Sequence, residues 1–267
     1  MPFAEIADTC LEYERHAGAG NRSPIVLLHE GLGSVSMWRD FPARLAAASA
    51  HTVVAYSRAG YGKSDPLPDS LDPRGARRGL RKPDFMHREA WEVLPALLAS
   101  LNIERPVLFG HSDGASIALL YAARHAATGV IAMAPHVVVE PISITSIEAA
   151  RTAWETTDLP ARLARHHDDA EGAFRGWSDA WLDAAFRDWN IESEMAAITA
   201  PILAIQGEDD QYGTLYQIEE IARRNPRTRL FKIPGCGHAP HREATDVVLS
   251  AVQSFLATLP EVKRTGA

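Results

Sequence analysis

The chain has 267 residues and a formal net charge of −7, and 46% of its residues are hydrophobic. This length fits one large domain with an insertion, and the composition is that of a globular protein, which excludes a disordered chain. The acidic balance gives no electrostatic reason to bind nucleic acid or an anionic membrane, and no apolar run approaches the ~20 residues of a membrane helix.

The ends of the chain and its cysteines add further expectations. Residues 1–5 lack the regions of a signal peptide, and Cys10 and Cys236 are too far apart in sequence to suggest a disulfide framework or a metal site. We therefore expect a cytoplasmic protein with a small-molecule substrate, no metal or organic cofactor, and no nucleic-acid or membrane partner. Residues 263–267 are expected to fray. A solvated loop is expected to carry Arg74, Arg77, Arg78, Arg81 and Lys82.

Short apolar segments alternate with amphipathic helical patterns along the chain. Buried strands are predicted at Pro24–Leu28, Thr52–Tyr56, Pro106–Phe109, Val130–Met133, Pro201–Ile205 and Arg229–Ile233. Apolar residues repeat at helical spacing over 91–101 and 248–256. This alternation predicts an α/β fold with a mainly parallel sheet and helices on both faces, and the segment before Pro24 predicts one or two antiparallel edge strands.

One long segment interrupts this alternation. No convincing strand occurs between Met133 and Pro201, where 147–156 and 168–188 are predicted to be helical. We therefore expect residues 1–135 and 201–267 to form the core and residues 136–200 to form a helical insertion above the sheet. Its side chains Phe174, Trp177 and Trp181 fall on one helix face, where they either pack the insertion onto the core or line a substrate pocket.

The strongest chemical signal is the sequence Gly110-His111-Ser112-Asp113-Gly114. It follows the predicted strand that ends at Phe109 and precedes a helical run from Ala115 to Ala123. A sharp strand-to-helix turn would expose the serine at the carboxyl edge of the sheet, with flanking glycines that permit close backbone approach. The helix N-terminus would favour negative charge beside it. Ser112 is therefore predicted to be a nucleophile.

A serine nucleophile needs a base, and the base needs an acid that fixes its tautomer. His238 follows the predicted strand that ends at Ile233, so it is expected in a loop at the same edge of the sheet; His241 is the weaker candidate. Three carboxylates follow the strand ending at Ile205. Asp210 is favoured over Asp209 and Glu208, and Ser112, Asp210, His238 is a known chain order for such a triad.

An oxyanion hole is the fourth part that such chemistry requires. The loop His29-Glu30-Gly31-Leu32-Gly33 follows the first predicted parallel strand, and the N–H of Gly31 is expected to point above Ser112. The second donor is the N–H of Asp113, the residue after the nucleophile. The Asp113 carboxylate is read as a first-turn helix residue rather than a catalyst.

Together these residues resemble the α/β-hydrolase superfamily over nearly the whole chain. The matching segments are 28–31, 57–65, the turn around Ser112, 207–210 and 237–238. The resemblance implies a helical cap at about 136–200, and it supports Asp210 as the acid because the family places it fourth in a Gly-x-x-Asp turn. Glu30 departs from the family, which usually has glycine there, and it could put a carboxylate near the pocket. Capped esterases and hydrolases of aromatic-degradation clusters are the nearest subgroup.

The predicted function is hydrolysis of a carboxylic ester through an acyl-enzyme. C–C bond hydrolysis and acyl-CoA thioester hydrolysis use the same triad and stay open, because one fold hosts many chemistries. A non-hydrolytic ligand-binding receptor is the alternative of another class, and the complete set Ser112, Asp210 and His238 argues against it. An insertion rich in Trp and Phe suggests an apolar or aromatic substrate. The candidate pocket residues are Glu30, His136, Trp177, Trp181 and Tyr212.

Overall fold

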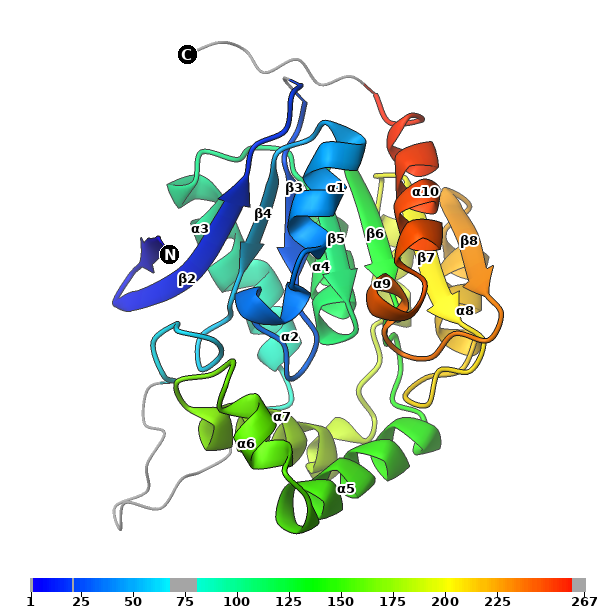
Figure 1. Ribbon diagram of the computed structural model, residues 1–267. Coiled ribbons are helices and arrows are strands. Elements are labelled where there is room, and N and C mark those ends of the chain that lie inside the picture. The colour runs from blue at the N-terminus through cyan, green and yellow to red at the C-terminus, as the bar shows by residue number, and fades with distance from the viewer. Residues whose placement is uncertain (1, 21, 68–80, 261–267) are drawn as a thin grey trace.

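A computed structural model of the protein describes residues 2–20, 22–67 and 81–260 (Figure 1). Arg74, Arg77 and Arg78 of the predicted basic loop, and the predicted frayed end at 263–267, lie outside the described residues. The two other members of that loop, Arg81 and Lys82, precede a helix that begins at Phe85.

An eight-stranded sheet in the order β1-β2-β4-β3-β5-β6-β7-β8 forms the centre of the fold. Within this sheet β1–β2 and β2–β4 pair antiparallel, and the other five strand pairs that the structure describes are parallel, which confirms the predicted mainly parallel sheet with antiparallel edge strands. The strands are β1 Phe3–Ile6, β2 Thr9–His16, β3 Ile25–Leu28, β4 Val53–Tyr56, β5 Val107–His111, β6 Gly129–Met133, β7 Ile202–Gly207 and β8 Thr228–Ile233.

Helices cover both faces of this sheet, because side chains alternate between the two faces along each strand. In β3, Val26 and Leu28 join one buried cluster, whereas Ile25 and Leu27 join the other. The helices of the core are η1 Val35–Trp38, α1 Phe41–Ser49, α2 Phe85–Arg88, η2 Glu89–Val93, α3 Leu94–Ser100, α4 Asp113–Arg124, α8 Tyr216–Arg224, α9 Pro240–Glu243 and α10 Thr245–Leu256. Helices α1 and α10 pack on the face of Ile25, and α3, α4 and α8 pack on the face of Val26.

The segment between β6 and β7 contains α5 Pro141–Thr156, α6 Leu159–Leu163, α7 Ala170–Leu182, η3 Ala184–Phe186 and η4 Glu192–Ala197. Its helices α5, α6 and α7 gather beyond the carboxyl ends of the parallel strands (Figure 1). The predicted helix over 168–188 is too long. The Asp169 side chain accepts the N–H of Gly172 and caps the N-terminus of α7, which therefore begins at Ala170. Asp183 adopts an extended backbone, which ends the helix at Leu182. Helix α5 begins earlier than predicted, because Pro141 is tolerated in a first turn.

The register of the parallel strands brings several loops to one edge of the sheet. Leu28 pairs with Gly110, His111 with Met133, and Gly207 with Ile233. The loops that follow β3, β5, β7 and β8 therefore leave the sheet together, on the side where α5–α7 lie. Within the described ranges, every helix is too short or too polar to span a lipid bilayer.

Candidate active site

Ser112 occupies the sharp turn between β5 and α4. Its φ of 54° and ψ of −122° are unusual for a residue with a side chain, and such backbone conformations cost about 1–3 kcal/mol. The turn is held because the Ser112 N–H donates to the Met133 carbonyl at 2.9 Å. The flanking glycines leave no room for a side chain, since a Cβ at Gly110 would collide with the Gly114 backbone and one at Gly114 with the Leu28 backbone. The turn therefore presents the Ser112 hydroxyl at the sheet edge.

His238 stands between Ser112 and Asp210. Its Nε2 lies 2.9 Å from Ser112 Oγ, and its Nδ1 lies 2.8 Å from each carboxylate oxygen of Asp210. A carboxylate can only accept, so the proton of a neutral His238 ring is on Nδ1 and Nε2 presents its lone pair to the Ser112 hydroxyl. This tautomer is the one in which His238 can take a proton from Ser112.

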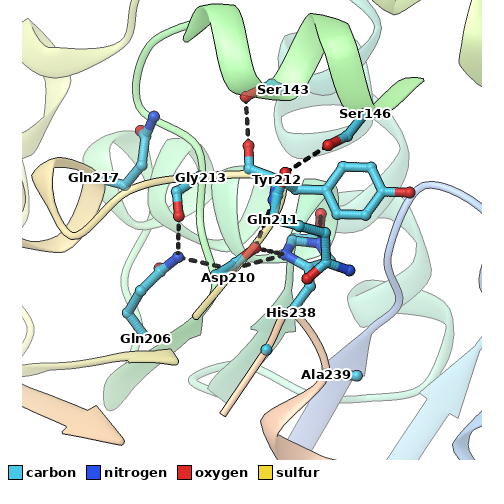
Figure 2. A network of polar contacts seen from close by, with 12 residues as sticks. Ser143, Ser146, Gln206, Asp210, Gln211, Tyr212, Gly213, Gln217, His238 and Ala239 are labelled. Carbon is cyan, nitrogen blue, oxygen red and sulfur yellow. Dashed lines mark hydrogen bonds and ion pairs between the residues drawn. The ribbon is translucent and has the colours of Figure 1, made fainter. Parts of the chain in front are cut away.

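The loop after β7 holds Asp210 in place (Figure 2). Its Oδ2 accepts from Gln206 Nε2 at 2.7 Å, and its Oδ1 accepts the Tyr212 N–H at 2.8 Å. Burial would raise the pKa of the Asp210 carboxyl, but its contacts with His238 and the Tyr212 N–H outweigh this and lower the pKa. Asp210 is therefore ionised at neutral pH. The two competing carboxylates, Glu208 and Asp209, are exposed to solvent.

Two serines of α5 reach across to the same loop (Figure 2). Ser143 Oγ donates to the Tyr212 carbonyl, and Ser146 Oγ donates to the Gln211 carbonyl, both at 2.5 Å. The acid loop is thus fixed from below by the side chain of Gln206 and from above by the inserted segment.

A pocket opens above Ser112, and the space among its lining atoms, including its solvent-open mouth, is about 460 Å³. The residues that line it come from the β3 loop, the serine turn, the acid and base loops and the inserted segment. They are Glu30, Gly31, Leu32, Ser112, Asp113, His136, Ser143, Ile147, Trp177, Trp181, Tyr212 and His238. Every site residue predicted from the sequence lines this pocket except Asp210, which lies behind His238.

The two tryptophans of α7 pack directly on the predicted oxyanion loops. A Cβ at Gly31 would collide with the Trp177 indole, so this ring lies against the Gly31 backbone. Trp181 donates its indole N–H to Asp113 Oδ1 at 3.1 Å. Burial raises the pKa of the Asp113 carboxyl, and Arg58, whose guanidinium lies 3.9 Å away, opposes the rise. Phe174, the third aromatic residue on this helix, stacks on Trp154 within the inserted segment instead.

His136 and Tyr212 also line the pocket, and both lie near the ring of His238. The ring of His136 lies 4.8 Å from the ring of Trp181 and 6.0 Å from that of His238. Burial lowers the pKa of His136 to about 3, so its imidazole is neutral at pH 7. The Tyr212 ring lies 4.7 Å from the His238 ring. Both residues restrict the space in which the base can move.

Glu30 lies at the rim of the pocket, but its carboxylate turns toward the core. Oε2 lies 3.4 Å from His111 Nδ1, and Oε1 lies 3.7 Å from an Arg242 nitrogen. Burial would raise the pKa of the Glu30 carboxyl, but the contact with His111 and the charge of Arg242 hold the pKa well below its usual range. Its backbone carbonyl accepts from Arg58 at 2.8 Å. The loop that carries Gly31 therefore also carries a charged carboxylate.

Sequence reasoning did not single out two polar residues that support the site. Gln206 anchors Asp210, and His111 Nε2 donates to the backbone carbonyl of His238 at 2.7 Å. Both stand near the end of a strand whose other members are apolar, and both are buried. A polar residue in an otherwise apolar buried strand indicates a specific polar contact, because buried polar groups normally have a hydrogen-bond partner.

No group of three or more His, Cys, Asp or Glu side chains within residues 2–20, 22–67 and 81–260 has an arrangement that could hold a metal ion.

Comparison with known proteins identifies the relatives of this chain. The profile of the alpha/beta hydrolase family matches residues 25–251. A proline iminopeptidase of Lactobacillus helveticus is 23% identical over 89% of this chain and 92% of its own length. The esterase YbfF of Escherichia coli is 24% identical over 88% of this chain and 94% of its own length.

The fold recurs in solved structures. The enol-lactonase of Burkholderia xenovorans superposes with a TM-score of 0.71 over 96% of this chain and 100% of that chain, at 23% identity. At this identity the likeness concerns the fold alone.

Proposed function

The chain belongs to the alpha/beta hydrolase family, and from this premise we propose that it is a serine hydrolase that cleaves a carboxylic ester through an acyl-enzyme. The observation that carries this proposal is the continuous contact from Ser112 Oγ to His238 Nε2 at 2.9 Å and from His238 Nδ1 to Asp210 at 2.8 Å. A hydroxyl becomes a useful nucleophile when an adjacent base accepts its proton, and a fixed carboxylate stabilises the protonated base.

In the acylation step, Ser112 Oγ attacks the carbonyl carbon of the ester while its proton passes to His238 Nε2. The negative charge of the resulting tetrahedral intermediate rests on the former carbonyl oxygen. We assign the N–H groups of Gly31 and Asp113 as its donors, since both residues line the pocket beside Ser112. Asp113 is also the first residue of α4, whose N-terminal N–H groups have no acceptor within the helix.

The intermediate then breaks its bond to the alcohol oxygen, and His238 gives the proton to this leaving group. The product is an ester between the acyl group and Ser112. A water molecule next loses a proton to His238 Nε2 and attacks the acyl carbon. Collapse of the second tetrahedral intermediate returns the proton to Ser112 Oγ and releases the carboxylic acid.

The pocket favours a small to medium apolar or aromatic substrate. Its wall contains Leu32, Ile147, Trp177 and Trp181. Apolar surface of this kind stabilises an apolar group in proportion to the area removed from water. Residues 136–200, which supply five of the twelve lining residues, are proposed to be a helical cap over Ser112. The similarity to an esterase of Escherichia coli supports the ester as the bond cleaved.

A fluorophosphonate tests this proposal, because it reacts with an activated serine whatever the natural substrate is. We expect labelling of the wild-type protein on the peptide that contains Ser112, located by mass spectrometry. Ser112→Ala should abolish labelling and lower turnover of p-nitrophenyl esters by about 10⁶-fold while retaining the fold. The matched control is Ser254→Ala, an exposed serine on α10, which should behave as wild type. Near-normal turnover by Ser112→Ala would refute the proposal.

Ester chain length then defines the substrate class. A series from p-nitrophenyl acetate to octanoate, measured beside acyl-CoA thioesters, should show higher kcat/KM for oxygen esters of short to medium acyl groups. A clear preference for the thioesters would change the proposed substrate from an ester to a thioester, but Ser112 would stay the proposed nucleophile.

A further inference from the structure

Two charged or polar side chains beside His238 have no part in the reaction described above. His111 is the last residue of β5, directly before the nucleophile, and is 2% exposed. Glu30 belongs to the loop after β3, and its side chain is 17% exposed. Among the described residues, neither side chain forms a hydrogen bond or ion pair with Ser112 or Asp210, yet both lie where the loops of the site converge. Their contacts connect the loop of Glu30 to the loop of His238.

The direction of the first contact follows from its chemistry. His111 Nε2 lies 2.7 Å from the backbone carbonyl oxygen of His238, and a carbonyl oxygen can only accept. His111 Nε2 therefore carries a proton and donates it to the base loop. This bond fixes the backbone of His238, whereas Asp210 fixes the far side of its ring.

Glu30 meets the other nitrogen of the same ring. Its Oε2 lies 3.4 Å from His111 Nδ1, which has no hydrogen-bond partner among the described residues, so the two groups form an ion pair when His111 carries a proton on both nitrogens. The groups around His111 are the rings of Trp38, His238 and His241, at 6.4, 5.2 and 4.8 Å, and the charge of Arg242 is 3.7 Å from Glu30. Of these neighbours only Glu30 is anionic. It is therefore the group that can hold the His111 ring with Nε2 toward His238.

We propose that Glu30 and His111 are positioning residues, in which the Glu30 carboxylate orients the His111 ring and the His111 N–H holds the backbone carbonyl of His238 in place. This rests on the proposed function, since it assigns a task to groups around its base. The loop that carries Gly31 is thereby linked to the loop that carries His238. One carboxylate sets the relative position of the oxyanion donor and the base.

A double-mutant cycle tests this link, with p-nitrophenyl acetate as substrate and fluorophosphonate labelling of Ser112 as a second readout. Glu30→Gln and His111→Leu should each lower kcat by about 10- to 100-fold, with KM within about 3-fold of wild type, because misplacement of a catalytic group affects the chemical step. The double variant should be no slower than the slower single variant, since both act through one contact.

Rescue separates positioning from packing. His111→Gln keeps an amide N–H that can reach the His238 carbonyl, so it should be at least about 10-fold faster than His111→Leu. In the His111→Gln background Glu30→Gln should have little further effect, because glutamine has no second nitrogen to pair with Glu30. This comparison also carries the test if His111→Leu does not fold, as judged by circular dichroism. The control Glu92→Gln, an exposed residue of η2, should match wild type.

Three results would overturn the proposal. These are a Glu30→Gln enzyme within about 2-fold of wild-type kcat, independent multiplicative losses in the double variant, and no advantage of glutamine over leucine at position 111. Multiplicative losses would instead place Glu30 in direct contact with substrate. If wild-type Ser112 is not labelled at all, the proposed function fails; if it is labelled and Glu30→Gln is labelled as fast, only the positioning role fails.

Discussion

Replacement of Asp210 by asparagine tests the acid with little change of shape. Both oxygens of Asp210 are in use: Oδ1 lies 2.8 Å from the Tyr212 N–H, Oδ2 lies 2.7 Å from Gln206 Nε2, and each lies 2.8 Å from His238 Nδ1. The Tyr212 N–H belongs to the backbone and cannot turn away. The asparagine oxygen must therefore take the place of Oδ1, and its NH₂ group must face Gln206 and His238.

Gln206 can adapt to this change, but His238 cannot. Gln206 can turn its amide, since its Oε1 is buried without a hydrogen-bond partner in the described part of the chain, although this loses its bond to the Gly213 carbonyl. The asparagine oxygen in the place of Oδ1 would still lie near His238 Nδ1, but the NH₂ group lies equally close and donates toward it, which favours the tautomer with the proton on Nε2. That tautomer cannot accept the Ser112 proton. Asparagine also lacks the negative charge that stabilises a protonated His238. We expect kcat to fall by about 10⁴-fold, which is about 5.5 kcal/mol in the activation free energy.

Steady-state hydrolysis of p-nitrophenyl butyrate measures this loss, with thermal unfolding as the check that Asp210→Asn is folded. The matched control is Asp209→Asn. Asp209 is exposed, and the contact that places it is its backbone N–H to the Cys236 carbonyl at 2.9 Å, which the substitution retains. We expect Asp209→Asn within about 2-fold of wild type, as for most exposed positions. If Asp209→Asn is the crippling change, or Asp210→Asn keeps more than a tenth of the activity, the assignment of the acid is wrong.

Two further predictions concern the pocket wall. Trp181→Phe keeps a ring but removes the indole N–H that donates to the buried Asp113 carboxylate. The free energy of unfolding in urea should therefore fall by about 1–3 kcal/mol. The control Trp154→Phe changes a ring that stacks on Phe174, and it should lower the free energy of unfolding by less. Burial lowers the pKa of His136 to about 3, whereas an unfolded histidine has a pKa near 6.5. Between these pH values the unfolded chain binds more protons than the folded chain. The free energy of unfolding therefore falls as pH falls, by up to about 1.4 kcal/mol per pH unit. Urea titrations at pH 7, 6 and 5 should therefore show a smaller loss of stability for His136→Gln than for wild type, and an equal loss would contradict the buried neutral ring.

The strands were predictable because each is a short apolar run bounded by glycine, proline or charge. All six predicted parallel strands occur, and their ends differ by at most two residues from the prediction. The largest differences are at the carboxyl ends of β5 and β7, where the apolar pattern stops at Phe109 and Ile205. Backbone pairing with Met133 and Ile233 continues past these points into His111 and Gly207, since ladder hydrogen bonds do not depend on side-chain polarity.

The candidate site was predictable to the extent that its residues follow strands that end at one edge. This argument brought Ser112, Asp210 and His238 together, because a parallel sheet aligns the loops that leave it. It could not find the link from Glu30 through His111 to the His238 carbonyl. That link depends on side-chain orientation between segments far apart in sequence, 81 residues from Glu30 to His111 and 127 from His111 to His238, for which no local spacing gives a signal.

The inserted segment was the least predictable part, and its contacts explain why this affects the chemistry. Trp177 packs on Gly31, Trp181 bonds to Asp113, and Ser143 and Ser146 hold the loop of Asp210. Each of these contacts joins the segment to a loop that positions either the nucleophile, the oxyanion donors or the acid. A displacement of α5 or α7 would therefore break hydrogen bonds of the acid loop or leave the Asp113 carboxylate without its donor.

The same segment is tied to the β3 loop by His167. Its Nδ1 accepts the Gly62 N–H at 2.9 Å, and its Nε2 donates to the Leu32 carbonyl at 3.0 Å, so the neutral ring uses both nitrogens. Burial lowers the pKa of His167, which keeps it in this neutral form at pH 7. Leu32 is the neighbour of Gly31, so this bond joins the proposed oxyanion loop to the inserted segment. The geometry around Ser112 is therefore a property of core and insertion together, and substitutions in the contacts of α5 and α7 should change kcat as well as KM.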